Sequence, residues 1–127
     1  MTTLSIPQGH HTVMPYLILN NAAQFFDFTK SVFNAQEVSR YLREGSTEIM
    51  HAEISIGDSL IMFGQAGGPW QPCTAGLYVY VADADDCYAK AIAAGATSIF
   101  PPENKDYGRS GGITDPFGNT WWITQLL

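Results

Sequence analysis

The sequence predicts an α+β domain made of two copies of one βαβββ unit. Hydrophobic residues make up 46% of the 127 residues and charged residues 14%, as in a single folded domain with a real core. Segments of strand-like and helical periodicity follow one another in the same order twice. Residues 57–61 align with 118–122 at an offset of 61, and residues 19–22 align with 81–84 at an offset of 62. An internal repeat of this length is stronger evidence than either copy alone.

The first copy spans about residues 12–63 of the single domain 1–127. The run HTVMPYLILN reads as a strand, and NNAAQFFDFTKSVFNA places Ala22, Phe25, Phe28 and Val32 at helical spacing. Asn21 suits the N-cap of this helix, and Asn34 suits the left-handed position after its end. EVSRYLRE, EIMHAEISI and SLIMF then read as three strands joined by turns at EGST and Gly57-Asp58.

The second copy spans about residues 76–125, after a glycine-rich linker at about 64–75. GLYVYV reads as a strand and DADDCYAKAIAAGA as a helix, with Asp83 as N-cap and Gly95 as its stop signal. TSIF, GRSGGIT and NTWWITQ are the remaining strands, and Asp115 begins a type I turn, DPFG, before the last of them. The pair Gly111-Gly112 indicates a close backbone approach, either to a neighbouring strand or to a ligand.

Charge and composition exclude several classes of partner. Six basic and twelve acidic residues give a formal net charge of −6, whereas nucleic acids and anionic membrane surfaces attract basic patches. No apolar run is long enough to span a membrane. Cys73 and Cys87 have no metal or redox spacing, and MTTLSIPQGHHT has no signal-peptide pattern. We expect a soluble, cytoplasmic protein that binds neither nucleic acid nor membrane.

The repeat and several short motifs resemble a known superfamily over about residues 12–125. PYL, MHAEISIGDS, YGRSGG and DPFGNTWW are most similar to the PhnB-like, glyoxalase-related branch of the vicinal oxygen chelate superfamily, which includes glyoxalase I, extradiol dioxygenases and bleomycin-resistance proteins. The resemblance implies two βαβββ modules whose strands form a curved, cup-shaped mixed sheet with the helices outside. It also implies a homodimer, with sites near the subunit contact.

The resemblance further implies four positions for metal ligands. In metal-dependent members, the first strand of each module supplies a ligand five residues before its closing aliphatic residue. The last strand supplies one four residues after the turn glycine. These positions hold Met14, Gly76, Ile61 and Trp122 here, and none offers the nitrogen or carboxylate oxygen that Zn²⁺, Fe²⁺ or Mn²⁺ prefers. We therefore expect no metal and no other cofactor.

Adjacent Trp121 and Trp122 must point to opposite faces of the last strand. We predict that Trp121 faces the helices as core and that Trp122 faces the cup. The same alternation places Tyr16, Phe63, Tyr78 and Tyr80 on the cup face, with Met14 beside them. Ile61 is a further candidate ligand-binding residue. Aromatic rings with hydroxyl groups suit a flat organic ligand, and they also suit plain packing or a dimer interface.

Polar residues near this predicted cup are candidates for binding or catalysis. His51 and Glu53 share one strand face and read as a polar pair or as a chelating pair, and Glu53 is a candidate base or counter-charge for a cation. Tyr107 and Arg109 precede a strand at the rim. Arg109 either reaches a ligand or pairs with a carboxylate such as Asp115.

Three classes of function follow. The first is a metal-free protein that binds a small aromatic compound, including a cationic one, and resembles bleomycin-resistance proteins. The second is a metal-dependent lyase or dioxygenase, which the family supports and the residues at the ligand positions oppose. The third is a metal-free enzyme that uses Glu53 or Arg109 as its catalytic residue.

Overall fold

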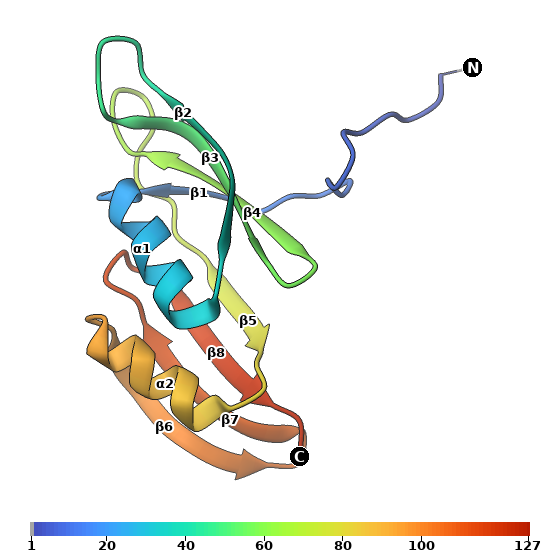
Figure 1. The fold of residues 1–127 in the computed structure, drawn as a ribbon, viewed down its shortest axis with the longest axis vertical. Helices are drawn as coiled ribbons and strands as arrows, with labels where there is room; N and C mark the ends of the chain where they lie inside the picture. The colour runs from blue at the N-terminus through green and yellow to red at the C-terminus, as the bar shows by residue number, and fades with distance from the viewer. Residues whose placement is uncertain (1) are drawn as a thin grey trace.

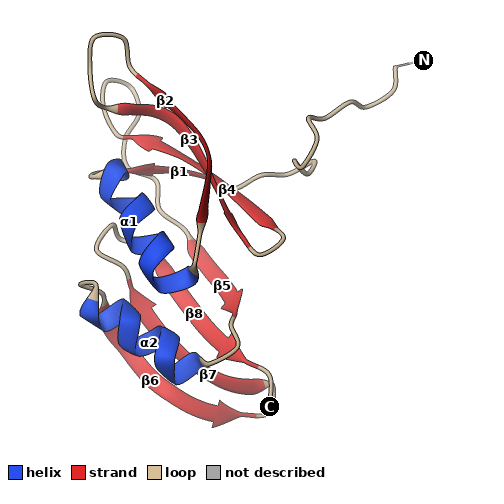
Figure 2. Ribbon diagram, viewed as in Figure 1, coloured by secondary structure: helices blue, strands red, loops and turns tan. Residues whose placement is uncertain are grey.

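The computed structural model describes residues 2–127 and confirms two βαβββ modules in an α+β fold (Figures 1 and 2). Module 1 consists of β1 (Tyr16–Leu19), α1 (Ala22–Phe33), β2 (Gln36–Leu42), β3 (Ile49–Ile56) and β4 (Ser59–Gln65). Module 2 consists of β5 (Gly76–Tyr80), α2 (Ala84–Ala93), β6 (Thr97–Lys105), β7 (Gly108–Thr114) and β8 (Thr120–Gln125).

The strands form two four-stranded sheets with the same topology. Their orders are β1-β4-β3-β2 and β5-β8-β7-β6, with the first strand of each module parallel to the last and the other neighbours antiparallel. Both helices lie on the same side of the sheets (Figure 2), so each sheet has a helix-facing side and an opposite side that we call the open face. In the part of the chain that the structure describes, neither helix is long and apolar enough to cross a bilayer.

The helix ends are capped in two ways. Asp83 caps α2 as predicted, because its side chain accepts a hydrogen bond from the backbone N–H of Asp86 at 3.0 Å. Asn21 precedes α1 in a left-handed conformation and makes no side-chain cap. Instead, the side-chain oxygen of Gln65 accepts a hydrogen bond of 2.9 Å from the backbone N–H of Ala22. Gln125 accepts the equivalent bond from Ala84 in module 2. The last strand of each module thus holds the start of its own helix.

The predicted strand TSIF continues further than its composition suggested. β6 runs through Pro101 and Pro102 to Lys105, and its register with β7 is irregular between Ser98 and Glu103. Proline cannot donate a ladder hydrogen bond, but β6 is an edge strand, where an N–H group is not required on the outer side.

The two modules share one hydrophobic core, because α1 packs against both. On its own sheet, Phe25 meets Phe63 edge-to-face with ring centroids 4.9 Å apart. Phe25 also contacts Phe117 of module 2 at 5.5 Å, and Phe33 lies 4.3 Å from Trp121 of β8. Trp121 is 1% exposed, which confirms its predicted place in the core.

Asp115 fixes the turn that carries these module 2 aromatics. One of its carboxylate oxygens accepts the backbone N–H groups of Phe117 and Asn119, each at 2.9 Å. The other accepts the side-chain amide of Asn119 at 2.9 Å and the indole N–H of Trp121 at 2.8 Å. Charge-assisted bonds of this kind are roughly twice as strong as neutral ones. The buried carboxylate therefore joins the turn to the tryptophan on which α1 packs.

The prediction that Phe63 faces the cup is wrong. Phe63 is fully buried under α1 and Ile61 is 5% exposed, both on the helix-facing side. The β3–β4 turn contains only Gly57 and Asp58, whereas the β7–β8 turn contains residues 115–119. Aligning Gly57 with Gly118 therefore misaligns the last strands of the two copies by one residue. A shift of one residue along a strand moves a side chain to the opposite face of the sheet.

Replacing Trp121 should cost far more stability than replacing Trp122. Trp121→Ala empties a buried ring site and removes the indole N–H that donates to Asp115, so we expect a loss of about 3–5 kcal/mol in the free energy of unfolding. Trp122 is 38% exposed, and Trp122→Ala should cost less. Urea unfolding followed by circular dichroism measures both, and equal losses would contradict the assignment of opposite faces.

Candidate functional site

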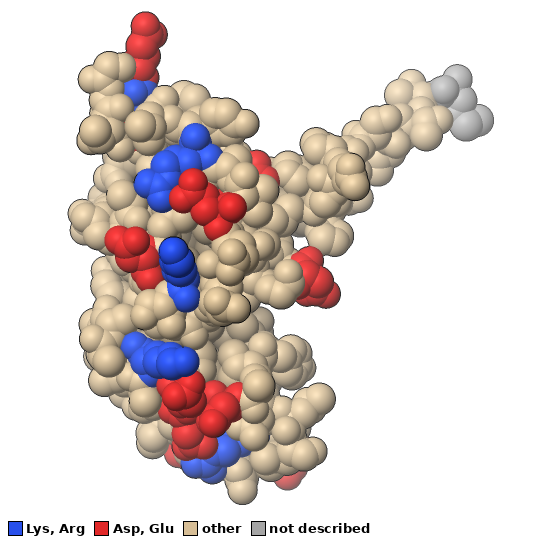
Figure 3. All heavy atoms as spheres, in the orientation of Figure 1, with Lys and Arg blue, Asp and Glu red and all other residues tan. Residues whose placement is uncertain are grey.

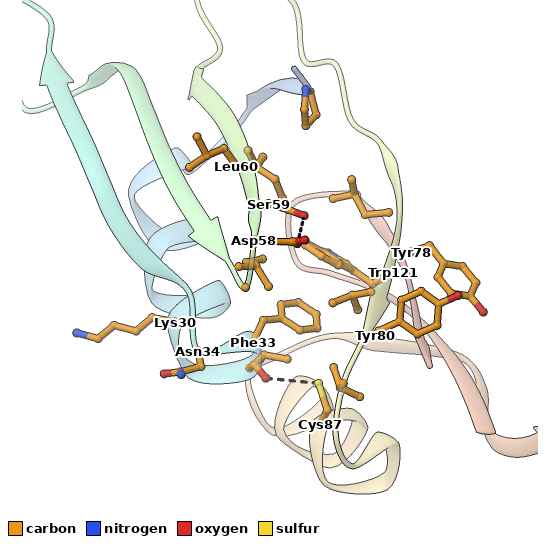
Figure 4. Close-up of a pocket in the computed structure, with 18 of the residues that line it drawn as sticks. Lys30, Phe33, Asn34, Asp58, Ser59, Leu60, Tyr78, Tyr80, Cys87 and Trp121 are labelled. Atoms are coloured by element: carbon orange, nitrogen blue, oxygen red, sulfur yellow. Dashed lines mark hydrogen bonds between the residues drawn. The ribbon is translucent and has the colours of Figure 1, made fainter. Parts of the chain in front are cut away.

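A groove of about 910 Å³ lies between the two modules (Figure 4). One wall comes from the end of α1 and from the β3–β4 hairpin, and the other comes from β5 and the start of α2. Its aromatic and aliphatic lining includes Phe33, Leu60, Leu77, Tyr78, Tyr80 and Trp121. Met14 and Ile61 also reach it, so four of the predicted ligand-binding residues line this groove.

Acidic groups slightly outnumber basic groups around the groove. Asp58, Asp83 and Asp86 line it together with Lys30 and Lys90. Lys90 is paired with Asp86 at 3.0 Å, so these two charges offset each other. The remaining two acidic groups and one basic group favour a neutral or cationic occupant over an anionic one.

Cys87 lines the groove but is not an activated nucleophile. Burial, and to a smaller extent the nearby carboxylate of Asp86, raises the pKa of its thiol to about 11. The sulfur also contacts the backbone carbonyl of Val32 at 3.4 Å. A thiol with such a high pKa carries almost no thiolate at neutral pH, so Cys87 contributes packing.

The open face of module 2 carries a row of aromatic rings. Trp122 opposes Tyr78 on one side and Gly112 on the other. A side chain at Gly112 would collide with the Phe100 ring, because a Cβ there would lie 2.6 Å from it. The close approach predicted for Gly111-Gly112 is therefore made by a neighbouring strand. Tyr78 and Tyr80 extend the row with ring centroids 5.3 Å apart, and both are half exposed or more.

Four positions of this chain correspond to the metal ligands of metal-dependent members of the superfamily that it resembles, and their residues do not fit a metal ion. The Trp122 indole fills the space over Gly76, where a Cβ would lie only 2.9 Å from the ring. Strand register shows that the module 1 counterpart of Trp122 is Met62, since Met62 opposes Tyr16 as Trp122 opposes Tyr78. A thioether, a glycine and an indole supply no hard donor. Within residues 2–127, no group of three His, Cys, Asp or Glu side chains has the arrangement of a metal site.

A polar cluster lies on the open face of module 1. Glu53 is buried and accepts hydrogen bonds on both carboxylate oxygens, from His10 Nε2 at 2.8 Å and from His51 Nε2 at 3.0 Å. The other ring nitrogen of His51 lies 3.1 Å from the Tyr16 hydroxyl. The hydrogen bond from His51, more than the one from His10, lowers the pKa of Glu53, while its burial acts in the opposite direction.

Two other predicted site residues lie away from both the groove and this cluster. Arg109 makes a bidentate pair with Asp85 of α2, at 2.7 and 2.9 Å, and its third contact is Asn104 at 3.1 Å. Its guanidinium thus faces α2 on the helix side of β7, and the carboxylate it pairs with is Asp85 and not Asp115. Tyr107 is exposed in the turn between β6 and β7.

Neither His10 nor the groove itself could be identified from sequence patterns. His10 comes from a segment without periodicity, and only the path of the chain brings it to Glu53, 43 positions away. The groove walls come from helix ends and from the helix-facing side of strands, which sequence periodicity identifies only as core. The two histidines adjacent in sequence, His10 and His11, were the available signal that one side chain would face the sheet.

Glu53→Gln should destabilise the protein in a pH-dependent way. In the folded state the pKa of Glu53 lies below its ordinary value of 4.5. The hydrogen bonds of the ionised carboxylate therefore stabilise the fold fully above pH 4.5, and this contribution is lost as the pH falls through the lower folded pKa. We expect a loss of about 1–3 kcal/mol at pH 7 that shrinks toward pH 3. Urea unfolding at several pH values tests this, with exposed Glu44→Gln as a control that changes little. A loss that is independent of pH would contradict the assignment.

Comparisons with known proteins agree with this fold. An uncharacterised protein of Mycobacterium bovis is 28% identical over 123 residues, which cover 87% of this chain and 80% of the relative. The structure of the PhnB protein from Bacillus cereus matches with a TM-score of 0.74 at 18% identity, covering 91% of this chain and 99% of that one. TnmS3, an antibiotic binding protein from Streptomyces sp. CB03234, matches with a TM-score of 0.70 at 16% identity over 93% and 100% of the two chains.

The sequence pattern of one family covers most of the chain, from residue 9 to residue 123. The two βαβββ modules, their parallel pairing of first and last strands and the resemblance of the repeat motifs all agree with it. This chain belongs to the Glyoxalase/Bleomycin resistance protein/Dioxygenase superfamily.

Proposed function

We propose that this protein binds a small aromatic compound in the groove between its modules, without a metal ion. The groove carries the proposal, since about 910 Å³ is the size of a typical site for a small organic ligand. Rings from both modules line it, and Asp58 and Ser59 supply polar groups, whereas Tyr78 and Tyr80 lie at its edge with their hydroxyl groups pointing away from Phe33 (Figure 4). Such a combination of apolar area and a few polar groups suits a flat organic molecule.

The charge of the protein supports neutral and cationic ligands. The net charge is −6, and Figure 3 shows acidic and basic side chains gathered over the helices and hairpins. At the groove, Asp58 and Asp83 outnumber Lys30 once Lys90 is paired with Asp86. A cationic aromatic compound would therefore meet a favourable potential, which acts mainly on the rate of association.

Two further observations favour binding over metal-dependent chemistry. The superfamily positions for metal ligands hold Met14, Gly76, Met62 and Trp122, whose side chains lack the donors that such enzymes use. A protein of the same fold, TnmS3, is described as an antibiotic binding protein.

Both cysteines are free, which is consistent with action in the reducing cytoplasm.

A fluorescence screen of planar aromatic compounds tests the groove. We expect a bound ligand to change the fluorescence emission of Trp121. Tyr80→Ala should weaken the affinity for that ligand by roughly 2- to 12-fold, because a ring–ring contact contributes about 0.5–1.5 kcal/mol beyond buried area. Tyr107→Ala is a matched control, since Tyr107 is similarly exposed but lies in the β6–β7 turn. Affinities are measured by isothermal titration calorimetry.

Two results would overturn this proposal. Equal losses for Tyr80→Ala and Tyr107→Ala would place the ligand elsewhere. Near-equimolar Zn, Ni, Fe or Mn in protein purified without chelator would favour the alternative of a glyoxalase-like lyase or dioxygenase, above all if the metal were lost in His51→Ala or Glu53→Ala.

We also propose that the functional form is a homodimer. Trp122, Tyr78 and Tyr80 leave much apolar area uncovered on the open face of module 2. The start of the chain, residues 2–9, extends away from the body and contains no Lys, Arg, Asp or Glu (Figures 1 and 3), and Val13 further along is 84% exposed. Aromatic residues are favoured in subunit interfaces, so a second copy is a suitable cover.

Sedimentation velocity tests the dimer. We expect a species of twice the 13.9 kDa chain mass at micromolar concentration. A charge placed among the open-face rings, as in Tyr80→Asp, should shift the equilibrium toward monomer, whereas Tyr107→Asp at the β6–β7 turn should not. A stable monomer in the unmodified protein would refute the proposal.

A further inference from the structure

Tyr16, His51, Glu53 and His10 form a continuous hydrogen-bonded chain on the open face of module 1. The contacts are 3.1 Å from the Tyr16 hydroxyl to His51 Nδ1, 3.0 Å from His51 Nε2 to Glu53, and 2.8 Å from Glu53 to His10 Nε2. Three different parts of the chain supply the members: the N-terminal segment, β1 and β3. The buried carboxylate of Glu53 lies between the two histidines, and one end of the chain is Tyr16, which is 44% exposed.

The chemistry of the members decides where the protons lie. The two hydrogen bonds that lower the pKa of Glu53 keep its carboxyl ionised, so it can only accept hydrogen bonds. His51 must then carry a proton on Nε2, and in the neutral ring its Nδ1 is an acceptor. The phenolic O–H of Tyr16 therefore donates to Nδ1. The order is phenol, imidazole, carboxylate.

We propose that this chain is a proton relay that makes the Tyr16 oxygen a nucleophile toward acyl compounds such as activated esters and N-acyl azoles. A hydroxyl group, a histidine that accepts its proton, and a carboxylate that orients the histidine are the parts such a nucleophile needs. This activity requires neither a metal nor an occupied groove, and it is independent of the proposed binding function.

The step balances within the residues of the relay. The Tyr16 oxygen forms a bond to the acyl carbon while its proton moves to His51 Nδ1. The resulting imidazolium is stabilised by Glu53. The bond from the acyl carbon to the leaving group breaks, the leaving group departs with the electron pair, and His51 returns the proton to it. With N-acetylimidazole as the acyl donor, the products are O-acetyl-Tyr16 and imidazole.

The relay is needed because Tyr16 alone is a poor nucleophile at neutral pH. Burial raises the pKa of its phenol, and the charge of Arg43 offsets this only in part. Little phenolate therefore exists before the reaction, so a base must remove the proton during the step. The closed network also explains why His10 contacts Glu53, since that bond holds the second carboxylate oxygen and fixes the orientation of the carboxylate toward His51.

Other tyrosines serve as internal standards. Tyr78, Tyr80 and Tyr107 are 50%, 67% and 55% exposed, all more than Tyr16. Among residues 2–127, Tyr16 has the one tyrosine hydroxyl within hydrogen-bonding distance of a histidine. Exposure alone therefore predicts that Tyr16 reacts more slowly than these three, whereas the relay predicts the opposite.

The test is site-resolved acetylation of the full-length protein. The protein is treated with N-acetylimidazole at pH 7.5, and initial rates at each tyrosine are measured by peptide mass spectrometry. We expect Tyr16 to react at least about 10-fold faster than Tyr80, because a positioned base typically contributes 10²–10⁴-fold to a step. This comparison within the unmodified protein does not depend on any variant folding.

Variants then assign the effect to the relay. His51→Phe should reduce the Tyr16 rate to that of Tyr80 or below, and Glu53→Gln should reduce it in part, while the rates at Tyr80 and Tyr107 stay the same and report an intact fold. His11→Phe, next to the relay in sequence but outside it, should leave Tyr16 unchanged. A Tyr16 rate no higher than that of Tyr80, or a Tyr16 rate that His51→Phe does not alter, would overturn the proposal.

Discussion

The packing of α1 against both sheets is the interaction on which the rest of this structure depends. Phe25 contacts Phe63 in its own module and Phe117 in the other, and Phe33 lies against Trp121 of β8. Because each βαβββ module leaves apolar area that its own helix cannot cover, sharing one helix joins the two cores. The groove follows directly, since it is the space left between the end of α1, β5 and the β3–β4 hairpin.

The two copies of the repeat agree in the residues that hold the fold and differ in their turns and in the residues on their open faces. Equivalent features persist where they hold the fold, such as Gln65 and Gln125, which each cap a helix from the end of the last strand. The turns differ, with two residues in module 1 and five in module 2, where Asp115 holds the longer turn together. The open faces differ as well, since one carries aromatic rings in edge-to-face contact and the other a buried carboxylate with two histidines.

The groove and the open face of module 1 differ in the chemical groups that they carry. The groove offers apolar area and the carboxylates of Asp58 and Asp83 but no activated nucleophile, since burial keeps the Cys87 thiol protonated. The open face of module 1 offers an oriented acid–base network around Glu53. Where metal-dependent relatives place ligands, Trp122 lies over Gly76, so the family fold is retained while the metal position is filled by an aromatic ring.

The sequence by itself determined the local and repeated features of this protein. Periodicity and turn residues predicted both helices, most strands, the caps at Asn34 and Asp83 and the opposite faces of Trp121 and Trp122, because these depend on neighbours within a few residues. Tertiary structure alone decided the facing of Ile61 and Phe63, the pairing of Arg109 with Asp85, and the contact of His10 with Glu53. Strand register and contacts between distant segments are set by turn length and by which apolar surfaces pack together, and neither is encoded in a local pattern.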